Sequence, residues 1–195
     1  MPQNSVPSGA VVSCHLERPL DDECWRRFDA FRRRFAVLAL IRPPDPAHGE
    51  DEERWLERAR TLEQVGLHTH WTSPSHARPT GDGDPAERVR REAEWMRERG
   101  IEPRWFCGGG WYTDDAVEAT VQELGLVDCT PRGGVPREGV LPTTHSLGQL
   151  ARAVLGPLPP YVHGYFHDYD LLVVRRRAAL YGSVRILRAR RSRYV

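Results

Sequence analysis

Short apolar segments alternate with longer amphipathic segments along almost the whole chain, and this alternation constrains the fold more than any other feature. The apolar segments predict strands at residues 10–14, 36–41, 67–71, 104–107, 126–129 and 161–167. The segments with apolar residues at helical spacing predict helices at residues 22–34, 52–64, 84–99, 114–124, 146–155 and 171–191. Strands and helices that alternate about six or seven times indicate an α/β protein with a mainly parallel sheet, either open or closed into a barrel.

Capping residues mark several of the predicted helix ends. Asp84 is the expected N-cap of a helix with Pro85 in its first turn, and Gly100 is expected to close that helix. Gly66 is expected to terminate the helix over residues 52–64 in the same way. These boundaries support the helical assignments between the predicted strands.

Polar residues gather where the predicted strands end. In parallel α/β folds, ligands bind at the carboxyl ends of the strands, whether the sheet is open or a barrel. The polar and ionisable residues at these ends are His15, Glu17, His68, His70, Cys107, Asp128, His167 and Asp168. We therefore expect histidines from distant parts of the chain to converge at one end of the sheet.

The segment GLHTHWTSPSH, residues 66–76, contains an H-x-H pair, His68 and His70. Two residues apart on a strand, both imidazoles face the same side, and neutral imidazole is a preferred ligand of zinc and similar ions. An H-x-H pair alone is a weak motif, and a structural or solvent-facing pair is the competing interpretation. His15 and Glu17 offer further ligands with the same alternation, and His76 is a second choice.

The charge balance argues against a nucleic-acid or membrane partner. The formal net charge is +1, and all 28 basic residues are arginine. The C-terminal segment, residues 175–195, is rich in arginine and could bind a phosphate backbone. A surface helix with Leu180, Val184 and Leu187 facing inward would show the same pattern, and we favour this interpretation.

The cysteines and the N-terminus bear on the compartment. The four cysteines, which form no C-x-x-C pair, are Cys14, Cys24, Cys107 and Cys129. Reduced, mostly buried thiols are expected. Residues 1–9 lack the basic and apolar regions of a signal peptide and are expected to be a disordered lead-in to a single domain, residues 10–195. A cytoplasmic protein is therefore expected.

Four segments taken in order resemble the polysaccharide deacetylase family of carbohydrate esterases. They are VVSCHLERP, EQVGLHTHWTSP, RWFCGGGWYTDDAVEATVQELGL and YVHGYFHDYDLL. The resemblance covers most of residues 10–175, and it implies a distorted, incomplete (β/α) barrel of about six or seven mainly parallel strands. It also implies a metal-dependent N-deacetylase with a divalent ion, for which zinc is the expected choice.

The chain departs from the family pattern at three motifs. The first motif of the family carries two adjacent aspartates, whereas this chain has His15, Leu16 and Glu17. The second histidine ligand of the family falls on Thr72, so His70 or His76 would have to replace it. The arginine of the third motif is replaced by Cys107, while the late histidine is present as His167.

Roles follow from what hydrolysis of an acetamide requires. A metal ion with an open position polarises the carbonyl group and lowers the pKa of water. On this hypothesis His15, His68 and His70 bind the ion, Glu17 is the general base, and His167 protonates the leaving amine. Asp168 is a candidate to orient His167.

The glycine-rich third motif is the expected contact with substrate. The backbone amides of Gly109 and Gly110 are candidates for stabilising the oxyanion, and Trp111 and Tyr112 are candidates for stacking on a sugar ring. A strand-to-helix turn and ordinary packing residues are the competing interpretations. The expected function is removal of an acetyl group from an N-acetylated sugar or small glycoconjugate. The alternative is a catalytically impaired deacetylase-like fold that binds a ligand or partner.

Overall fold

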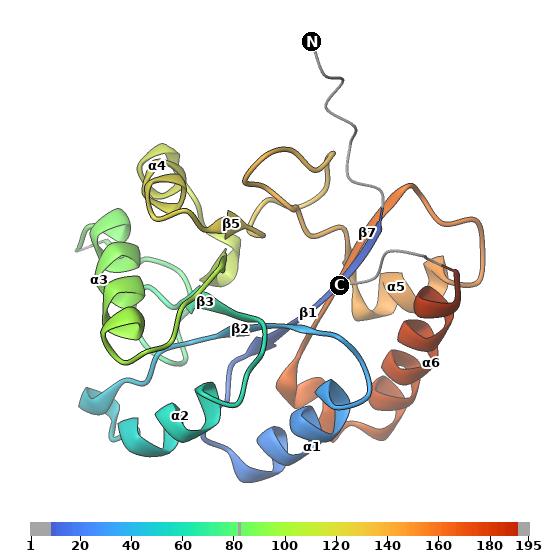
Figure 1. Ribbon diagram of the computed structural model, residues 1–195, viewed down its shortest axis with the longest axis horizontal. Coiled ribbons are helices and arrows are strands. Elements are labelled where there is room, and N and C mark those ends of the chain that lie inside the picture. The colour runs from blue at the N-terminus through green and yellow to red at the C-terminus, as the bar shows by residue number, and fades with distance from the viewer. Residues whose placement is uncertain (1–8, 82, 191–195) are drawn as a thin grey trace.

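The computed structural model describes residues 9–81 and 83–190 of the 195-residue chain. Seven strands form one sheet in the order β5-β4-β3-β2-β1-β7-β6. Every neighbouring pair of strands is parallel. The sheet curls into a half-barrel with the helices on its outside (Figure 1). The predicted α/β fold, an incomplete barrel of mainly parallel strands, is confirmed.

The strands are β1 (Gly9–Leu16), β2 (Leu38–Ile41), β3 (Val65–Thr69), β4 (Trp105–Gly108), β5 (Val127–Asp128), β6 (His145–Ser146) and β7 (Tyr161–His167). The α-helices are α1 (Asp22–Arg32), α2 (Glu52–Ala59), α3 (Pro85–Glu98), α4 (Asp115–Glu123), α5 (Leu147–Ala153) and α6 (Val174–Arg190). Three short 3₁₀ helices are η1 (Pro46–His48), η2 (Gly109–Trp111) and η3 (Asp168–Leu172). Of the lead-in predicted at residues 1–9, only Gly9 is described, and it begins β1; the rest lies outside the described residues.

Gly66 is part of β3 and does not end the preceding helix, so that expectation is wrong. Helix α2 ends at Ala59 with Arg60 as its C-cap, several residues before the predicted end. A Cβ atom at Gly66 would lie 2.7 Å from side-chain atoms of Leu40 and Trp105. Glycine is therefore required here because neighbouring strands approach closely. In the sequence, a glycine needed for this reason looks the same as a glycine that ends a helix.

Strand β1 presents alternate residues to two environments. Cys14 and Leu16 point outward and pack in the main core with Phe28 of α1. His15 points to the inside of the curl, where Val11 packs with residues of β2. The period of two along a strand thus separates an apolar outer layer from a partly polar inner layer.

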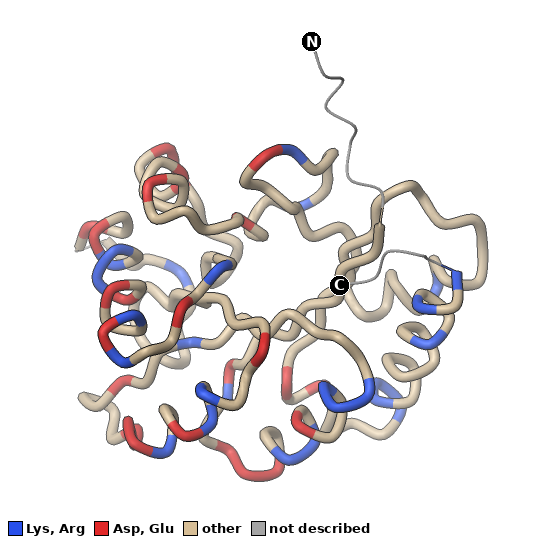
Figure 2. The backbone as a smooth tube through the Cα atoms, in the orientation of Figure 1, with Lys and Arg blue, Asp and Glu red and all other residues tan. Residues whose placement is uncertain are grey.

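Helix α6 packs as the sequence predicted, because Leu180, Val184 and Leu187 are all buried against the main core. Acidic and basic residues are interspersed along α1, α2 and α3 (Figure 2). All four cysteines are free and buried, as expected. Within the described residues, no helix is both long enough and apolar enough to cross a membrane.

Candidate active site

The carboxyl ends of β1, β3 and β7 bring the predicted histidines together. His15 on β1 is the register partner of His167 on β7, and their ring centroids are 5.3 Å apart. The His15 ring lies 4.7 Å from the His68 ring, and the His68 ring lies 5.0 Å from the His70 ring. The convergence expected from the strand-end positions is therefore present in the fold.

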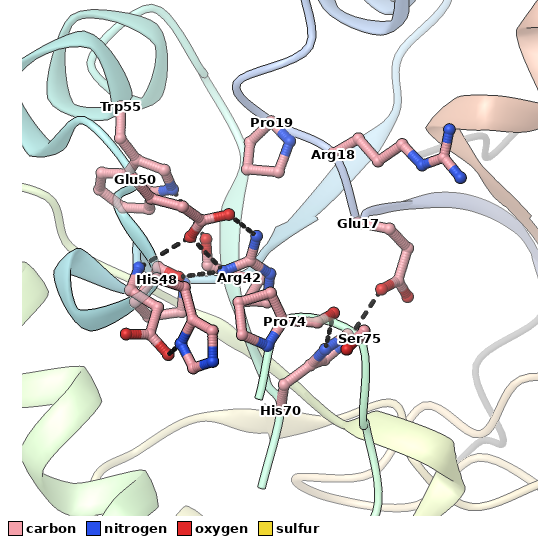
Figure 3. Close-up of polar contacts among 12 residues, drawn as sticks. Glu17, Arg18, Pro19, Arg42, His48, Glu50, Trp55, His70, Pro74 and Ser75 are labelled. Atoms are coloured by element: carbon pink, nitrogen blue, oxygen red, sulfur yellow. Dashed lines mark hydrogen bonds and ion pairs between the residues drawn. The ribbon is translucent and has the colours of Figure 1, made fainter. Parts of the chain in front are cut away.

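Glu17 extends from the end of β1 and places its carboxylate between the two imidazoles of the H-x-H pair. Its Oε1 atom lies 3.1 Å from Nε2 of His68, and its Oε2 atom lies 2.8 Å from Nε2 of His70. Figure 3 shows the carboxylate facing His70 across the end of the sheet. The two imidazoles are nearly inaccessible to solvent, whereas the side chain of Glu17 is 19% exposed.

The hydrogen bonds of the two histidines call for positive charge between them and Glu17. Nδ1 of His68 lies 2.9 Å from the Cys107 carbonyl oxygen, and Nδ1 of His70 lies 3.0 Å from that of Pro74. A carbonyl only accepts hydrogen bonds, so each Nδ1 carries a proton, and a neutral ring then turns an Nε2 lone pair toward the carboxylate. A divalent cation resolves this contact between lone pairs, and carbonyl bonds of this kind orient histidine ligands in metal sites.

The donor atoms around Glu17 therefore fit a metal ion. Nε2 of His70 has no hydrogen-bond partner of acceptable geometry among the described residues, despite its proximity to Glu17. One ligand atom each from Glu17, His68 and His70 lie within 4.8 Å of one another. Two imidazoles and a carboxylate form a ligand set suited to zinc and related ions.

The group of Glu17, His68 and His70 differs from the ligand set that the sequence-based hypothesis proposed. Glu17, expected to be the base, groups with His68 and His70. His15, expected to be a ligand, belongs to other groups, with His68 and Cys107 or with Glu17 and His167.

Nε2 of His15 is buried and has no hydrogen-bond partner among the described residues. Burial, followed by the charges of His68 and His167, lowers the pKa of His15 well below its ordinary value. The His15 ring is therefore neutral near pH 7 and has a free nitrogen lone pair. His76, the second-choice ligand, is exposed, and its backbone pairs with Ser73.

The ionisation of Glu17 is set by opposing effects. Burial raises the pKa of its carboxyl group, but the contacts with His68 and His70 lower it by more. The net pKa lies well below the ordinary range for glutamate. Glu17 is therefore ionised at neutral pH, as a cation ligand must be.

His167 lies beside Asp170, and Asp168 is engaged elsewhere. The backbone N–H of His167 donates to Oδ2 of Asp170 at 2.9 Å, and its Nδ1 lies 3.6 Å from the same oxygen. Asp168 is buried and accepts hydrogen bonds from the backbone N–H groups of Arg18 and Tyr169. Asp168 thus ties the end of β7 to the end of β1, and His167 keeps 26% of its side chain exposed.

An aromatic pair lies beside His15. Trp111 and Tyr165 have ring centroids 4.8 Å apart, and they lie 5.4 Å and 5.5 Å from the His15 ring. Tyr165 stands on β7 between His163 and His167, on the same face of the strand. The expected substrate residue Trp111 is therefore placed at the histidine cluster.

The remaining residues of the third motif pack against the second motif. A Cβ atom at Gly109 would lie 2.6 Å from the Thr69 carbonyl oxygen and 3.0 Å from Cδ2 of His70. Gly110 adopts a left-handed backbone conformation with φ 60°, and the ring of Tyr112 contacts that of Trp71 at 5.3 Å. Close packing behind His70 thus accounts for Gly109, and the ring of Tyr112 packs against Trp71.

His163 is a satisfied interior histidine, as the sequence suggested. Its Nε2 lies 2.9 Å from Oγ of Ser13, and its Nδ1 lies 3.0 Å from the carbonyl oxygen of Leu141. Burial lowers the pKa of His163 to about 4. The ring is therefore neutral and holds β1, β7 and the segment before β6 together.

Sequence reasoning missed Tyr165, Asp170 and Arg132 at this site. Tyr165 could have been found, because it alternates with His163 and His167 along one strand. Asp170 is three residues beyond His167 in η3, a position that carries no strand periodicity. Arg132 lies in a segment without regular structure, and no sequence signal separates it from the other arginines.

The sequence and the structure were compared with those of known proteins. The chain matches no protein-family model and no curated protein sequence. Its structure is similar to a family 4 carbohydrate esterase from Streptomyces lividans, with a TM-score of 0.62 and 13% identity over 95% of this chain and 91% of that one. It is also similar to a chitin deacetylase from Colletotrichum lindemuthianum, with a TM-score of 0.61 and 13% identity over 98% of this chain and 86% of that one.

A third similar structure is BA3943 from Bacillus anthracis, described as a CE4 family pseudoenzyme. The TM-score is 0.61 with 12% identity over 96% of this chain, which spans 63% of that one. This chain has the fold of the family 4 carbohydrate esterases. The deacetylase-like fold expected from the sequence motifs is therefore confirmed, and the similar structures include an esterase, a deacetylase and a pseudoenzyme.

Proposed function

We propose that this protein is a metal-dependent hydrolase that removes the acetyl group from an N-acetylated sugar or small glycoconjugate. The observation that carries the proposal is the placement of the ionised Glu17 between the Nε2 atoms of His68 and His70. That ligand set stands at the carboxyl end of a parallel sheet, where α/β enzymes carry their active sites. Zinc is the ion that the two imidazoles and the carboxylate would suit.

The reaction breaks the C–N bond of an acetamide and forms a C–O bond with water, so that acetate and a free amine are released. A divalent cation held by Glu17, His68 and His70 would polarise the acetamide carbonyl and lower the pKa of water. Nε2 of His15, which has no partner, can accept the proton of the attacking water. The partly exposed His167 can donate a proton to the leaving nitrogen, with its ring beside Asp170.

The substrate class is supported by the aromatic pair and by the similar structures. Trp111 and Tyr165 offer ring faces on which a sugar can stack beside His15. The similar structures are named as a carbohydrate esterase and a chitin deacetylase. We propose a small soluble substrate, in keeping with the cytoplasmic location that the sequence suggests and without a nucleic-acid or membrane partner.

The proposal is tested by incubating the zinc-loaded protein with N-acetylglucosamine and its short oligomers and measuring released acetate. We expect acetate release that depends on added metal and is lost on chelation. Protein that binds the ion stoichiometrically but releases no acetate from any N-acetylated sugar contradicts the hydrolase proposal.

The second candidate function is ligand binding without hydrolysis. The end of β1 favours it, because His15, Leu16 and Glu17 occupy the place of the two adjacent aspartates of the family motif. Leu16 is fully buried in the outer core and cannot take part in proton transfer. Binding of N-acetylated sugars without acetate release would favour this second function.

A further inference from the structure

Arg132 caps the aromatic pair beside His15. Its Cζ atom lies 4.3 Å from the ring centroid of Trp111, and its Nη2 donates to the Tyr165 hydroxyl at 2.7 Å. The side chain is exposed and belongs to the segment between β5 and β6. A guanidinium stacked on a ring keeps its remaining N–H donors free for a ligand.

The backbone of Trp111 adopts an unfavourable left-handed conformation. Trp111 has φ 61° and is the one non-glycine residue with positive φ among residues 9–81 and 83–190. Strained backbone of this kind persists only where its surroundings enforce it, and it concentrates at functional sites. The indole is thus held in place between His15 and Arg132.

Arg18 lies over Tyr169, the ring that stacks on His167. Its Cζ atom lies 5.5 Å from the ring centroid of Tyr169, and that ring stacks on His167 at 4.9 Å with an interplanar angle of 7°. The side chain is exposed, and Figure 3 shows it extending away from Glu17. Each arginine is therefore joined to the histidine cluster through aromatic rings.

The carboxylates nearby are already engaged, so they do not neutralise these two arginines. Glu17 faces His68 and His70. Asp168 accepts from backbone N–H groups, and Asp170 pairs with Arg176 at 2.7 Å. Within the described part of the chain, neither Arg18 nor Arg132 forms an ion pair with a carboxylate.

We propose that the natural substrate carries a phosphate group on its N-acetylated sugar, and that Arg132 binds this group, with Arg18 as the second unpaired arginine beside the histidine cluster. The inference rests on the proposed deacetylase function and names its substrate class. Guanidinium groups bind phosphate through paired, charge-assisted hydrogen bonds. A phosphate carries more charge and more oxygen atoms than a carboxylate, so it suits the unpaired guanidinium of Arg132 better.

Kinetic discrimination tests this inference. The zinc-loaded protein is assayed with N-acetylglucosamine 1-phosphate, with N-acetylglucosamine, and with N-acetylmuramic acid, which carries a carboxylate instead. We expect kcat/KM for the phosphorylated sugar to exceed that for the neutral sugar by at least about 10-fold, the minimum for a charge-assisted hydrogen bond. Arg132→Gln should lower kcat/KM for the phosphorylated sugar by about 10-fold to 100-fold more than it lowers kcat/KM for the neutral sugar.

Arg137→Gln is the matched control, because Arg137 is an exposed arginine of the same segment without contacts to the aromatic pair. This control variant should leave kcat/KM unchanged for all three sugars. Three outcomes would each overturn the inference. The first is equal kcat/KM for the phosphorylated and neutral sugars, and the second is a preference for the carboxylated sugar. The third is a phosphate preference retained in the Arg18→Gln, Arg132→Gln double variant.

A binding measurement separates failure of the inference from failure of the proposed function. If no sugar is hydrolysed, the proposed function fails, and N-acetylglucosamine 1-phosphate is titrated calorimetrically into the zinc-loaded protein and Arg132→Gln. Binding that weakens by about 10-fold or more in the variant supports the phosphate site even so. Absence of binding, or equal binding by both proteins, overturns it.

Discussion

Glu17 and His70 approach to 2.8 Å between Oε2 and Nε2, although Nδ1 of the same imidazole already faces the carbonyl oxygen of Pro74. A neutral imidazole has one N–H, and here acceptors face both of its nitrogens. The same holds for His68, which lies between Glu17 and the Cys107 carbonyl oxygen. Two buried histidines in this state require either two extra protons or one cation.

A bound divalent ion is the first prediction. Purified protein should contain about one equivalent of zinc or a related ion per chain by elemental analysis, in line with a single three-residue ligand set. The double variant His68→Ala, His70→Ala should lose it, because only Glu17 of that set remains. His48→Ala is the matched control, since the His48 side chain is 55% exposed and pairs with Asp45, which is not one of the three proposed ligands. Metal retained by the double variant would refute the ligand assignment.

Proton donation by His167 is the second prediction. His167→Gln should lower kcat for acetate release by about 100-fold to 10,000-fold, the range for loss of a general acid. Asp170→Asn should have a smaller effect, because the imidazole of His167 remains, although the substitution removes the charge that faces His167 and Arg176. Metal content and circular dichroism should match the unchanged protein in both variants. Full activity in His167→Gln would assign proton donation to another group.

The fold was predictable from the sequence because its signals are local and repeat. Strand β7 has its predicted bounds, Tyr161–His167, and Asp84 caps α3 as expected. Gly66 misled because close strand packing and helix termination both call for glycine. Strand β6 has two residues, too few for a periodicity to be detected.

The members of the site were predictable, but their partnerships were not. Strand ends indicate which side chains converge, and His15, His68 and His70 do meet. Which nitrogen faces which oxygen depends on backbone carbonyls such as that of Pro74, whose direction no sequence pattern records. The pairing of Glu17 with both imidazoles therefore required coordinates.

A buried ion pair next to the site gives the third prediction. Arg42 at the end of β2 pairs with Glu50 through two hydrogen bonds of 2.7 Å and 2.6 Å, as Figure 3 shows. The Arg42 side chain is 5% exposed, so removing its partner leaves a buried, uncompensated charge. Glu50→Gln should lower the free energy of unfolding by about 3 kcal/mol, measured by urea denaturation. Glu87→Gln, which breaks an exposed pair with Arg90, should cause no measurable change.

The pH dependence of stability supplies the fourth prediction, through His163. Burial lowers its pKa to about 4 from an ordinary value of 6.5, so between these values the unfolded chain binds a proton that the folded protein does not. This contribution to stability is complete above pH 6.5 and is lost as pH falls through the window toward 4. It amounts to about 3 kcal/mol between pH 7 and pH 4.

His163→Gln isolates this contribution, because glutamine does not titrate and every other group stays in place. The variant should be less stable at pH 7, since it loses the hydrogen bonds to Ser13 and Leu141. Its free energy of unfolding should fall less than that of the unchanged protein when the pH is lowered from 7 to 4. Parallel pH profiles for the two proteins would mean that His163 binds its proton over the same pH range in the folded and unfolded states, in conflict with a lowered pKa in the fold.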